Sequence, residues 1–122
     1  MKRILLVEDH VMARQVLKIF LEYHGYACDE AEHGAVALAW LEQGQHVDLI
    51  ISDHDMPVMT GLEFLVQVNA NPHFATIPFI LDSGNITDQL QRQAYQAGAR
   101  AVVNKPYNFS DFLALVTHTL ET

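Results

Sequence analysis

The chain has 122 residues, 50% of them hydrophobic, which is enough for one compact domain over residues 1–122 and too few for two. Fifteen acidic residues against seven basic ones give a formal net charge of −8, and this excludes a nucleic-acid surface of its own, which would need a basic face. The single cysteine, Cys28, excludes an internal disulfide and a cysteine-based zinc site. No apolar run is long enough for a signal peptide or a membrane span, so we expect a cytoplasmic protein without membrane contact.

Short apolar runs alternate with helical stretches along the chain. In chain order, the sequence predicts a strand at 4–7, a helix at 11–23, a weaker strand at 26–31, a helix at 34–41, a strand at 47–51, a helix at 62–68, a strand at 79–81, a helix at 87–96, a strand at 101–103 and a helix at 110–120. Nearly continuous apolar runs are typical of parallel strands that are covered on both faces. Five strand–helix repeats therefore predict an α/β domain with a parallel sheet and helices on both faces.

Spacing within the helical stretches predicts which side chains are buried and where helices end. The residues expected on buried helical faces are Val16, Leu17, Phe20, Leu21, Leu62, Leu65, Val66, Leu90, Ala94, Ala97, Phe112, Leu113, Leu115, Val116 and Leu120. Gly25, Gly44 and Gly98 follow helical stretches at positions where a left-handed residue commonly ends a helix. Thr87 and Ser110 are expected to cap the first turns of the last two helices.

Polar residues stand at the ends of four predicted strands. Glu8 and Asp9 follow the first strand, Asp53 the third, Ser83 the fourth and Lys105 the fifth. Ligands of parallel α/β sheets bind beyond the carboxyl ends of the strands. We therefore expect these side chains to converge on one rim of the sheet.

The charge of this group predicts the ligands that it can hold. Glu8, Asp9, Asp53 and Lys105 together carry −3 + 1 = −2. Two carboxylates ~5 Å apart repel each other by about 3 kcal/mol at an effective dielectric of ~20, so the group favours a hard divalent cation such as Mg²⁺. A cation with open coordination positions also suits a phosphoryl group. Lys105 and the Ser83 hydroxyl, with a main-chain N–H after it, could hold phosphoryl oxygens, which makes Asp53 the natural nucleophile for an aspartyl phosphate.

These motifs also follow one another in a specific order. They are Glu8-Asp9, the segment 53–61 with the pattern D-x-x-M-P-x-x-x-G, Ser83-Gly84, and Gly98-Ala99 ahead of Lys105-Pro106. In this order the chain resembles the receiver domain of two-component response regulators, from Lys2 to the last helix. The resemblance implies a CheY-like, flavodoxin-like, doubly wound (βα)5 fold with a five-stranded parallel sheet in strand order 2-1-3-4-5. It also implies a signalling switch that catalyses only its own phosphorylation and dephosphorylation.

The resemblance assigns a role to each site residue. Asp53 would accept the phosphoryl group from a phosphohistidine on a sensor histidine kinase or histidine phosphotransfer protein. The phosphorylated domain would then signal to a downstream output protein or domain. Asp9, Asp53 and the main-chain carbonyl of Asp55 would bind Mg²⁺, with Glu8 helping through water. Ser83 would hydrogen-bond the phosphoryl group, Lys105 would form an ion pair with it, and Gly84 would belong to the loop that moves on activation. A cis peptide bond would precede Pro106. Gly61 would stand where the backbone needs the conformational freedom of glycine.

Two residues depart from the pattern of this family. Val102 stands where the family usually has a Tyr or Phe that rotates on activation, so we expect the loop at 83–87 and the helix at 87–96 to respond instead. Asp82 is unusual in an otherwise apolar strand. Alternation points it away from Ser83, so we expect it at the rim of the sheet and not as a metal ligand.

The residues leave three other interpretations open. Asp53-His54-Asp55 resembles the D-x-D loop of a Mg²⁺-dependent phosphohydrolase, although those enzymes normally carry this loop on their first strand. His10 and His54 lie beside the carboxylates in the sequence and allow a fortuitous Zn²⁺ or Ni²⁺ site. The absence of an aromatic residue at Val102 allows a receiver-like module that binds partners without phosphorylation.

Overall fold

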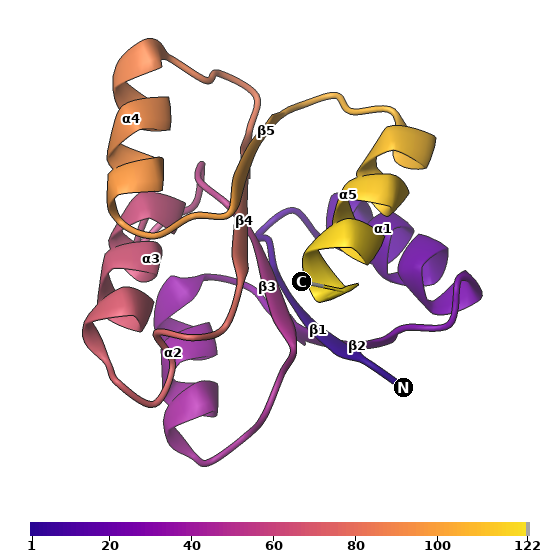
Figure 1. Ribbon diagram of the computed structural model, residues 1–122, viewed down its shortest axis with the longest axis horizontal. Coiled ribbons are helices and arrows are strands. Elements are labelled where there is room, and N and C mark those ends of the chain that lie inside the picture. Colours follow the sequence, from indigo (N-terminus) through magenta and orange to yellow (C-terminus); the bar gives the residue numbers. More distant parts are fainter. Residues whose placement is uncertain (122) are drawn as a thin grey trace.

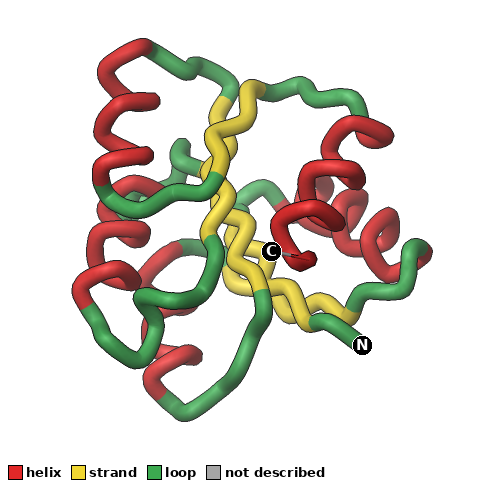
Figure 2. Tube along the Cα trace, in the orientation of Figure 1, coloured by secondary structure: helices red, strands yellow, loops and turns green. Residues whose placement is uncertain are grey.

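The computed structural model describes residues 1–121, and Figures 1 and 2 show the path of the chain. Its strands are β1 (Arg3–Val7), β2 (Ala27–Ala31), β3 (Leu49–Asp53), β4 (Phe79–Ser83) and β5 (Ala101–Asn104). Its helices are α1 (Val11–Tyr23), α2 (Gly34–Glu42), α3 (Gly61–Ala70), α4 (Asp88–Gln96) and α5 (Phe109–Glu121). None of the helices in this part of the chain is long and apolar enough to cross a membrane.

The strands form one parallel sheet in the order β2-β1-β3-β4-β5. Helices α1 and α5 cover one face of the sheet, and α2, α3 and α4 cover the other, as Figure 1 shows. The predicted strand–helix alternation, the parallel sheet and the strand order 2-1-3-4-5 are all confirmed.

Successive residues of the central strands point to opposite faces, so the sheet separates two apolar cores. The core under α1 and α5 contains Ile4, Leu6, Leu17, Leu21, Leu49, Ile51, Ile80, Phe112 and Val116. The core under α2, α3 and α4 includes Leu5, Val7, Ala37, Leu41, Ile50, Phe64, Leu65, Val68, Phe79, Leu81, Leu90 and Ala94. Since both faces are covered, the central strands carry apolar residues at nearly every position, which is the pattern that identified them in the sequence.

Two central strands extend further toward the functional rim than the apolar runs predicted. Strand β3 ends at Asp53 and β4 ends at Ser83, because the ladder between them continues to the pair Asp53–Asp82. Polar residues at the rim therefore belong to the strands and are positioned by the sheet. The helices begin and end within two residues of the predicted bounds.

Most of the predicted helix ends are confirmed. Gly25, Gly44 and Gly98 have φ values of 93°, 89° and 110°, the left-handed conformation that suits glycine. The Thr87 side chain accepts a hydrogen bond from the backbone N–H of Leu90 at 3.0 Å.

The predicted cap at Ser110 is wrong. Helix α5 begins one residue earlier, at Phe109, and the side-chain oxygen of Asn108 accepts the N–H of Asp111 at 3.0 Å. Asn and Ser are equally favourable at the capping position, so residue preference alone could not show whether Asn108 or Ser110 caps the helix.

The predicted burial of Val16 and Val66 is also wrong, since these side chains are 50% and 48% exposed. Each lies at the border of its helix's apolar stripe. The sheet covers only the centre of that stripe, which in α1 means Leu17 and Leu21.

Candidate functional site

Three carboxylates form a row across the carboxyl end of the sheet, on the face under α1 and α5. Glu8 directly follows β1, Asp53 ends β3, and Asp82 is the cross-strand neighbour of Asp53 in β4. The apolar residues two positions earlier, Leu6, Ile51 and Ile80, point into the core under α1 and α5. Because side chains alternate along a strand, the three acids point to this same face. We call Glu8, Asp53 and Asp82 the acidic row.

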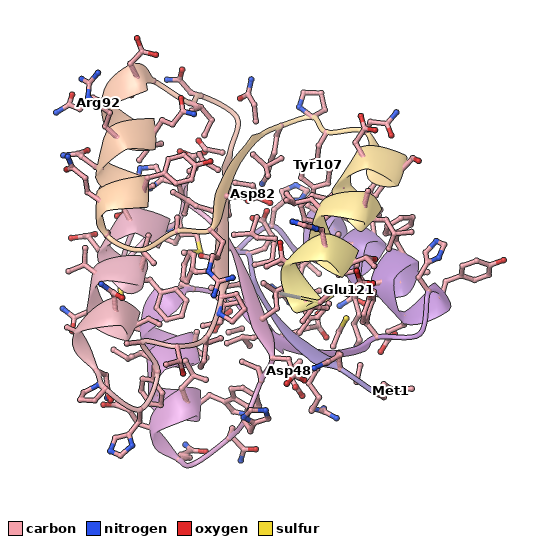
Figure 3. All side chains as sticks on the ribbon, viewed as in Figure 1. Met1, Asp48, Asp82, Arg92, Tyr107 and Glu121 are labelled. Carbon is pink, nitrogen blue, oxygen red and sulfur yellow. The ribbon has the colours of Figure 1, made fainter. Side chains whose placement is uncertain are left out.

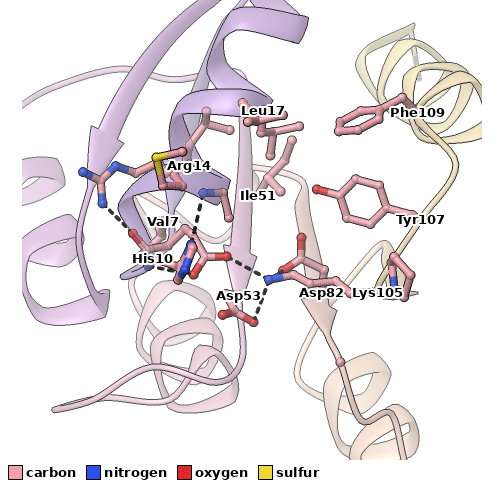
Figure 4. A pocket seen from close by; sticks show the side chains of 17 residues that line it. Val7, His10, Arg14, Leu17, Ile51, Asp53, Asp82, Lys105, Tyr107 and Phe109 are labelled. Carbon is pink, nitrogen blue, oxygen red and sulfur yellow. Dashed lines mark hydrogen bonds and ion pairs between the residues drawn. The ribbon is translucent and has the colours of Figure 1, made fainter.

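The side chain of Lys105, which follows β5, reaches over the acidic row. Its Nζ atom lies 2.8 Å from a Glu8 oxygen, 3.4 Å from an Asp53 oxygen and 3.7 Å from an Asp82 oxygen. Figure 4 shows the Lys105 amine directed at Asp53, with Asp82 beside it. The peptide bond between Lys105 and Pro106 is cis, as expected from the sequence.

Burial and charge shift the pKa values of these groups in different directions. Burial and the neighbouring Glu8 raise the pKa of Asp53 to about 6. Burial alone would raise the pKa of Glu8, but the hydrogen bonds from Lys105 and the His10 N–H, together with the charge of Lys105, outweigh it and hold that pKa below its ordinary value. Burial alone would lower the pKa of Lys105, but the carboxylates of Asp82 and Glu8 raise it. Lys105 therefore stays positively charged and can pair with a further anionic oxygen.

Asp82 lies at the carboxyl end of the sheet, as expected, but it is more deeply buried than a rim position implied. Its side chain does point away from Ser83, but it is 3% exposed and lies inside the fold, where Figure 3 shows it near Tyr107. Its Oδ1 atom forms no hydrogen bond, and burial raises its pKa to about 8. This depth was not expected, because the prediction placed Asp82 relative to Ser83 alone and did not consider that Asp82 shares its face of the sheet with Asp53.

The predicted metal ligands lie together. Glu8, Asp9 and Asp53 each offer a carboxylate oxygen, and these oxygens all lie within 4.8 Å of one another. Hard oxygen donors of this kind fit Mg²⁺. This three-residue group contains no histidine. The Nδ1 atom of His54 accepts the backbone N–H of Leu62 at 3.2 Å, and His10 caps α1, so the Zn²⁺ or Ni²⁺ interpretation gains no support.

Ser83 lies across from the loop that follows β3. Its hydroxyl donates a hydrogen bond to Oδ2 of Asp55 at 2.7 Å, and the N–H of Gly84 reaches the same oxygen at 3.4 Å. The N–H of Asp55 donates to Oδ1 of Asp53 at 3.2 Å, which orients the loop on the acidic row. The sequence contained no signal for the contact between the Asp55 side chain and Ser83, because Asp55 lies in the loop after β3 and Ser83 ends β4.

Gly61 is required for a reason other than the one expected. Its backbone is not in the left-handed region, and its N–H donates to the carbonyl oxygen of His54 at 3.1 Å. A Cβ atom at Gly61 would clash with the carbonyl oxygen of Asp53 and lie 2.7 Å from Cα of His54. The residue with the unusual backbone is Val58, whose φ is 70°. Gly61 thus allows α3 to start directly against the end of β3.

A cavity of about 610 Å³ opens beside the acidic row, between α1 and the segment that connects β5 to α5. Figure 4 shows its walls, which include Leu17 from α1, Ile51 from the sheet and the rings of Tyr107 and Phe109. The Tyr107 ring stacks on Phe112 with centroids 4.2 Å apart. The acidic row is therefore enclosed by apolar groups on this side and reached from the rim.

Residues 4–117 match the family model described as the response regulator receiver domain. A two-component response regulator of Oryza sativa subsp. japonica is 30% identical over 108 residues, which cover 88% of this chain and 89% of that protein. Histidine kinase P4 of Formosa agariphila is 34% identical over 118 residues, which cover 97% of this chain and 8% of that protein. The solved structure of the chemotaxis protein CheY4 of Vibrio cholerae, crystallised at low pH, is 30% identical, with a TM-score of 0.90 over 98% of both chains.

The match to the family model spans all of the sheet except Arg3, together with the acidic row and Lys105. The rice response regulator and the Vibrio cholerae structure are matched over most of their length, and the TM-score of 0.90 shows the same fold, whereas the chain spans only 8% of histidine kinase P4. The chain therefore belongs to the response regulator receiver domain family, the phosphoacceptor switches of two-component signal transduction.

Proposed function

We propose that Asp53 accepts a phosphoryl group from a phosphohistidine donor and that this modification switches the interaction with an output protein or domain. The observation that carries the proposal is the position of Lys105 Nζ, 3.4 Å from an oxygen of a buried Asp53. A carboxylate held beside a fixed cation is arranged to act as a nucleophile toward a phosphoryl group and to keep the product paired.

In the proposed reaction, an Asp53 oxygen attacks the phosphorus atom while the bond between phosphorus and the donor's imidazole nitrogen breaks. The imidazole leaves with the electron pair of that bond, as neutral imidazole when its second nitrogen carries a proton. Lys105 pairs with one oxygen of the transferred group, and Ser83 and the N–H of Gly84 donate to another. Attack of water on the same phosphorus later releases inorganic phosphate and restores the carboxylate, so the domain catalyses only its own modification and its reversal.

We assign Mg²⁺ to Asp9, Asp53 and the main-chain carbonyl of Asp55, with Glu8 bound through water. The spacing of the Glu8, Asp9 and Asp53 oxygens, all within 4.8 Å, supports this assignment. When bound, the ion supplies positive charge that neutralises oxygens of the phosphoryl group. The chain's own carboxylates would otherwise repel a phosphoryl group.

The phosphohydrolase alternative is less well supported. It needs Asp55 to deliver a proton to a leaving group, yet the Asp55 carboxylate accepts the Ser83 hydroxyl at 2.7 Å. Asp53 also lies on β3 and not on the first strand, where such enzymes carry the motif. The complete pocket argues against a module that works without phosphorylation, because the Glu8, Asp9 and Asp53 oxygens and the Lys105 amine all lie together.

Helix α1 supports a helical partner as the phosphoryl donor. Four of its exposed apolar residues form one stripe along its length: Met12 (69% exposed), Val16 (50%), Ile19 (65%) and Tyr23 (85%). Their spacing of four, three and four residues is that of a helix–helix seam. The stripe begins next to the Glu8–Asp9 turn, so a donor helix packed along it would bring a phosphohistidine close to Asp53. We therefore infer that the donor is a sensor histidine kinase or a histidine phosphotransfer protein.

We assign all of residues 1–122 to this one receiver domain, in line with the single sheet that joins its elements. We also propose a cytoplasmic location. The free thiol of Cys28 is consistent with a reducing compartment. Burial raises the pKa of this thiol to about 12, so it is unreactive and has no part in the proposed chemistry.

The proposed function is tested by incubating the protein with acetyl phosphate and Mg²⁺ and measuring its intact mass. We expect one added phosphoryl group, cleaved by hydroxylamine, in the wild-type protein and in the control Asp111→Asn, whose acid is exposed on α5. We expect no adduct in Asp53→Asn. An adduct that persists in Asp53→Asn would show that another residue is the acceptor.

A further inference from the structure

Two hydrogen-bond donors that the proposed function assigns to the phosphoryl group already have an anionic partner in the resting protein. These donors are the Ser83 hydroxyl and the Gly84 N–H, which we call the Ser83–Gly84 donor pair. Both reach one carboxylate oxygen, Oδ2 of Asp55, at 2.7 Å and 3.4 Å. The Ser83 hydroxyl also accepts the N–H of Asn85 at 3.1 Å, which fixes the loop around it.

We propose that the Asp55 carboxylate occupies, in the resting state, the place of a phosphoryl oxygen, and that its departure is a step of phosphorylation. This inference rests on the proposed function and adds to it a positioning residue, Asp55, that holds the Ser83–Gly84 donor pair. The pair can serve either Asp55 or the phosphoryl group on Asp53. Asp55 therefore competes with the incoming group and keeps the loop after β4 in its resting position.

The backbone and the side chain of Asp55 have separable roles in this arrangement. Its N–H donates to Asp53 at 3.2 Å, and its carbonyl is the ligand that we assign to Mg²⁺. Its side chain is exposed and can turn to solvent by rotation about its own bonds. Release of the Ser83–Gly84 donor pair therefore requires no movement of the main chain that holds the acidic row.

Electrostatic repulsion favours the transfer of the Ser83 hydrogen bond from Asp55 to the phosphoryl group. A phosphoryl group on Asp53 places negative oxygens beside the Asp55 carboxylate, and the repulsion weakens the bridge from Asp55 to Ser83. The Ser83 hydroxyl, which is fully buried, cannot turn to water when Asp55 leaves. It must find another acceptor, because a buried unpaired hydroxyl is costly, and the phosphoryl oxygen is the acceptor at hand.

The test compares Asp55→Ala, Asp55→Asn and the wild-type protein for the rate of phosphorylation by acetyl phosphate in saturating Mg²⁺. Asp55→Ala removes the acceptor and should react about tenfold faster, the effect of a hydrogen bond to a charged group. Asp55→Asn removes the charge but keeps an acceptor oxygen, so its rate should lie between the two. Repeating the rates at high salt separates the bridge from a general charge effect, because salt screens only the latter.

A second readout follows the bridge itself. In nuclear magnetic resonance spectra, the side-chain carboxyl carbon of Asp55 and the Gly84 amide should both shift when beryllofluoride, a phosphoryl mimic, binds the wild-type protein. In Asp55→Ala the Gly84 amide should already exchange faster before the mimic is added. Wild-type protein that is not phosphorylated on Asp53 would overturn the proposed function. Wild-type protein that is phosphorylated there, with Asp55→Ala reacting no faster, would overturn this inference alone.

Discussion

Asp82 lies buried in the acidic row, where Lys105 is the counter-charge that it shares with Glu8 and Asp53. Removing one partner of a buried ion pair usually destabilises a protein because the other charge is left alone. Here that cost is absent, since Lys105 would keep its contacts at 2.8 Å to Glu8 and 3.4 Å to Asp53. The Oδ1 atom of Asp82 also forms no hydrogen bond that would be lost.

We therefore expect Asp82→Asn to stabilise the metal-free protein, with a gain that depends on pH. The folded pKa of about 8 lies above the ordinary value of 3.8, so ionisation of Asp82 costs stability progressively as pH rises from about 4 to about 8. The free energy of unfolding in urea should favour Asp82→Asn by about 1 kcal/mol or more at pH 8 and by less at pH 5. A gain of equal size at both pH values, or a loss, would contradict this account of the acidic row.

At the scale of single elements, three hydrogen bonds from α1 converge on one residue of the edge strand β2. Glu30 accepts hydrogen bonds from Arg14 at 2.9 Å, Gln15 at 2.8 Å and Lys18 at 2.9 Å, all from α1. The hydrogen bond from Lys18 and that from Arg14 lower the pKa of Glu30 below its ordinary value of 4.5. Since α1 forms one wall of the site, this contact also positions the helix that we assign to the donor.

We expect Glu30→Gln to destabilise the protein by about 1–2 kcal/mol at pH 7. The folded pKa is the lower one, so the contribution of Glu30 is complete above about pH 4.5 and is lost as pH falls through the folded pKa. Urea unfolding at pH 7 and pH 3 should show a larger difference at pH 7 than at pH 3. The matched control is Glu32→Gln, which alters an exposed acid directly after β2 and should have little effect.

Helix α4 is the element that we expect to respond to phosphorylation. The hydroxyl of Tyr95 accepts a hydrogen bond from the N–H of Val102 at 3.3 Å. This bond links α4 to β5 through an aromatic side chain of the helix, whereas position 102 has no aromatic side chain. The apolar contacts of α4 are few, with Leu90 and Ala94 as its buried residues. An element with few buried contacts opens and shifts most readily.

Amide hydrogen exchange with and without beryllofluoride tests this expectation. Protection should change over residues 83–97 and remain nearly constant around 101–103, and Asp53→Asn should abolish the change. Tyr95→Phe should raise the exchange rate of the Val102 amide before the mimic is added, because its acceptor is gone. Changes confined to α1 and α2 would place the output surface elsewhere.

For the whole molecule, the balance of charge at the rim links stability to Mg²⁺. Mg²⁺ at ~100 times its dissociation constant should stabilise the fold by about 2.7 kcal/mol if it binds only the native state. Asp53→Asn should stabilise the metal-free protein, since the pKa of Asp53 is raised to about 6 by burial and by Glu8, and should weaken Mg²⁺ binding. Thermal unfolding across a Mg²⁺ titration provides the measurement. A melting temperature that does not change would contradict the assigned metal site.

The sequence was sufficient for the fold because each central strand is apolar on both faces and each helix ends at a recognisable residue such as Gly98. It was also sufficient to predict that Glu8, Asp9, Asp53 and Lys105 lie together, since each stands at the carboxyl end of a parallel strand. It was not sufficient for Asp82, whose depth depends on which helices cover its face. The Asp55–Ser83 contact depends on how the loop after β3 lies relative to the end of β4, and no local pattern encodes that distance.

The central claim is that Asp53 carries the phosphoryl group, and chemical mapping of the modified residue tests it most directly. Borohydride reduces an aspartyl phosphate to homoserine, which peptide mass spectrometry locates in the sequence. After treatment with acetyl phosphate and Mg²⁺, the account predicts homoserine at position 53 and at no other acid, including Asp9, Asp55 and Asp82. Homoserine at one of these other positions, or its absence from a protein that has gained the phosphoryl mass, would contradict the account.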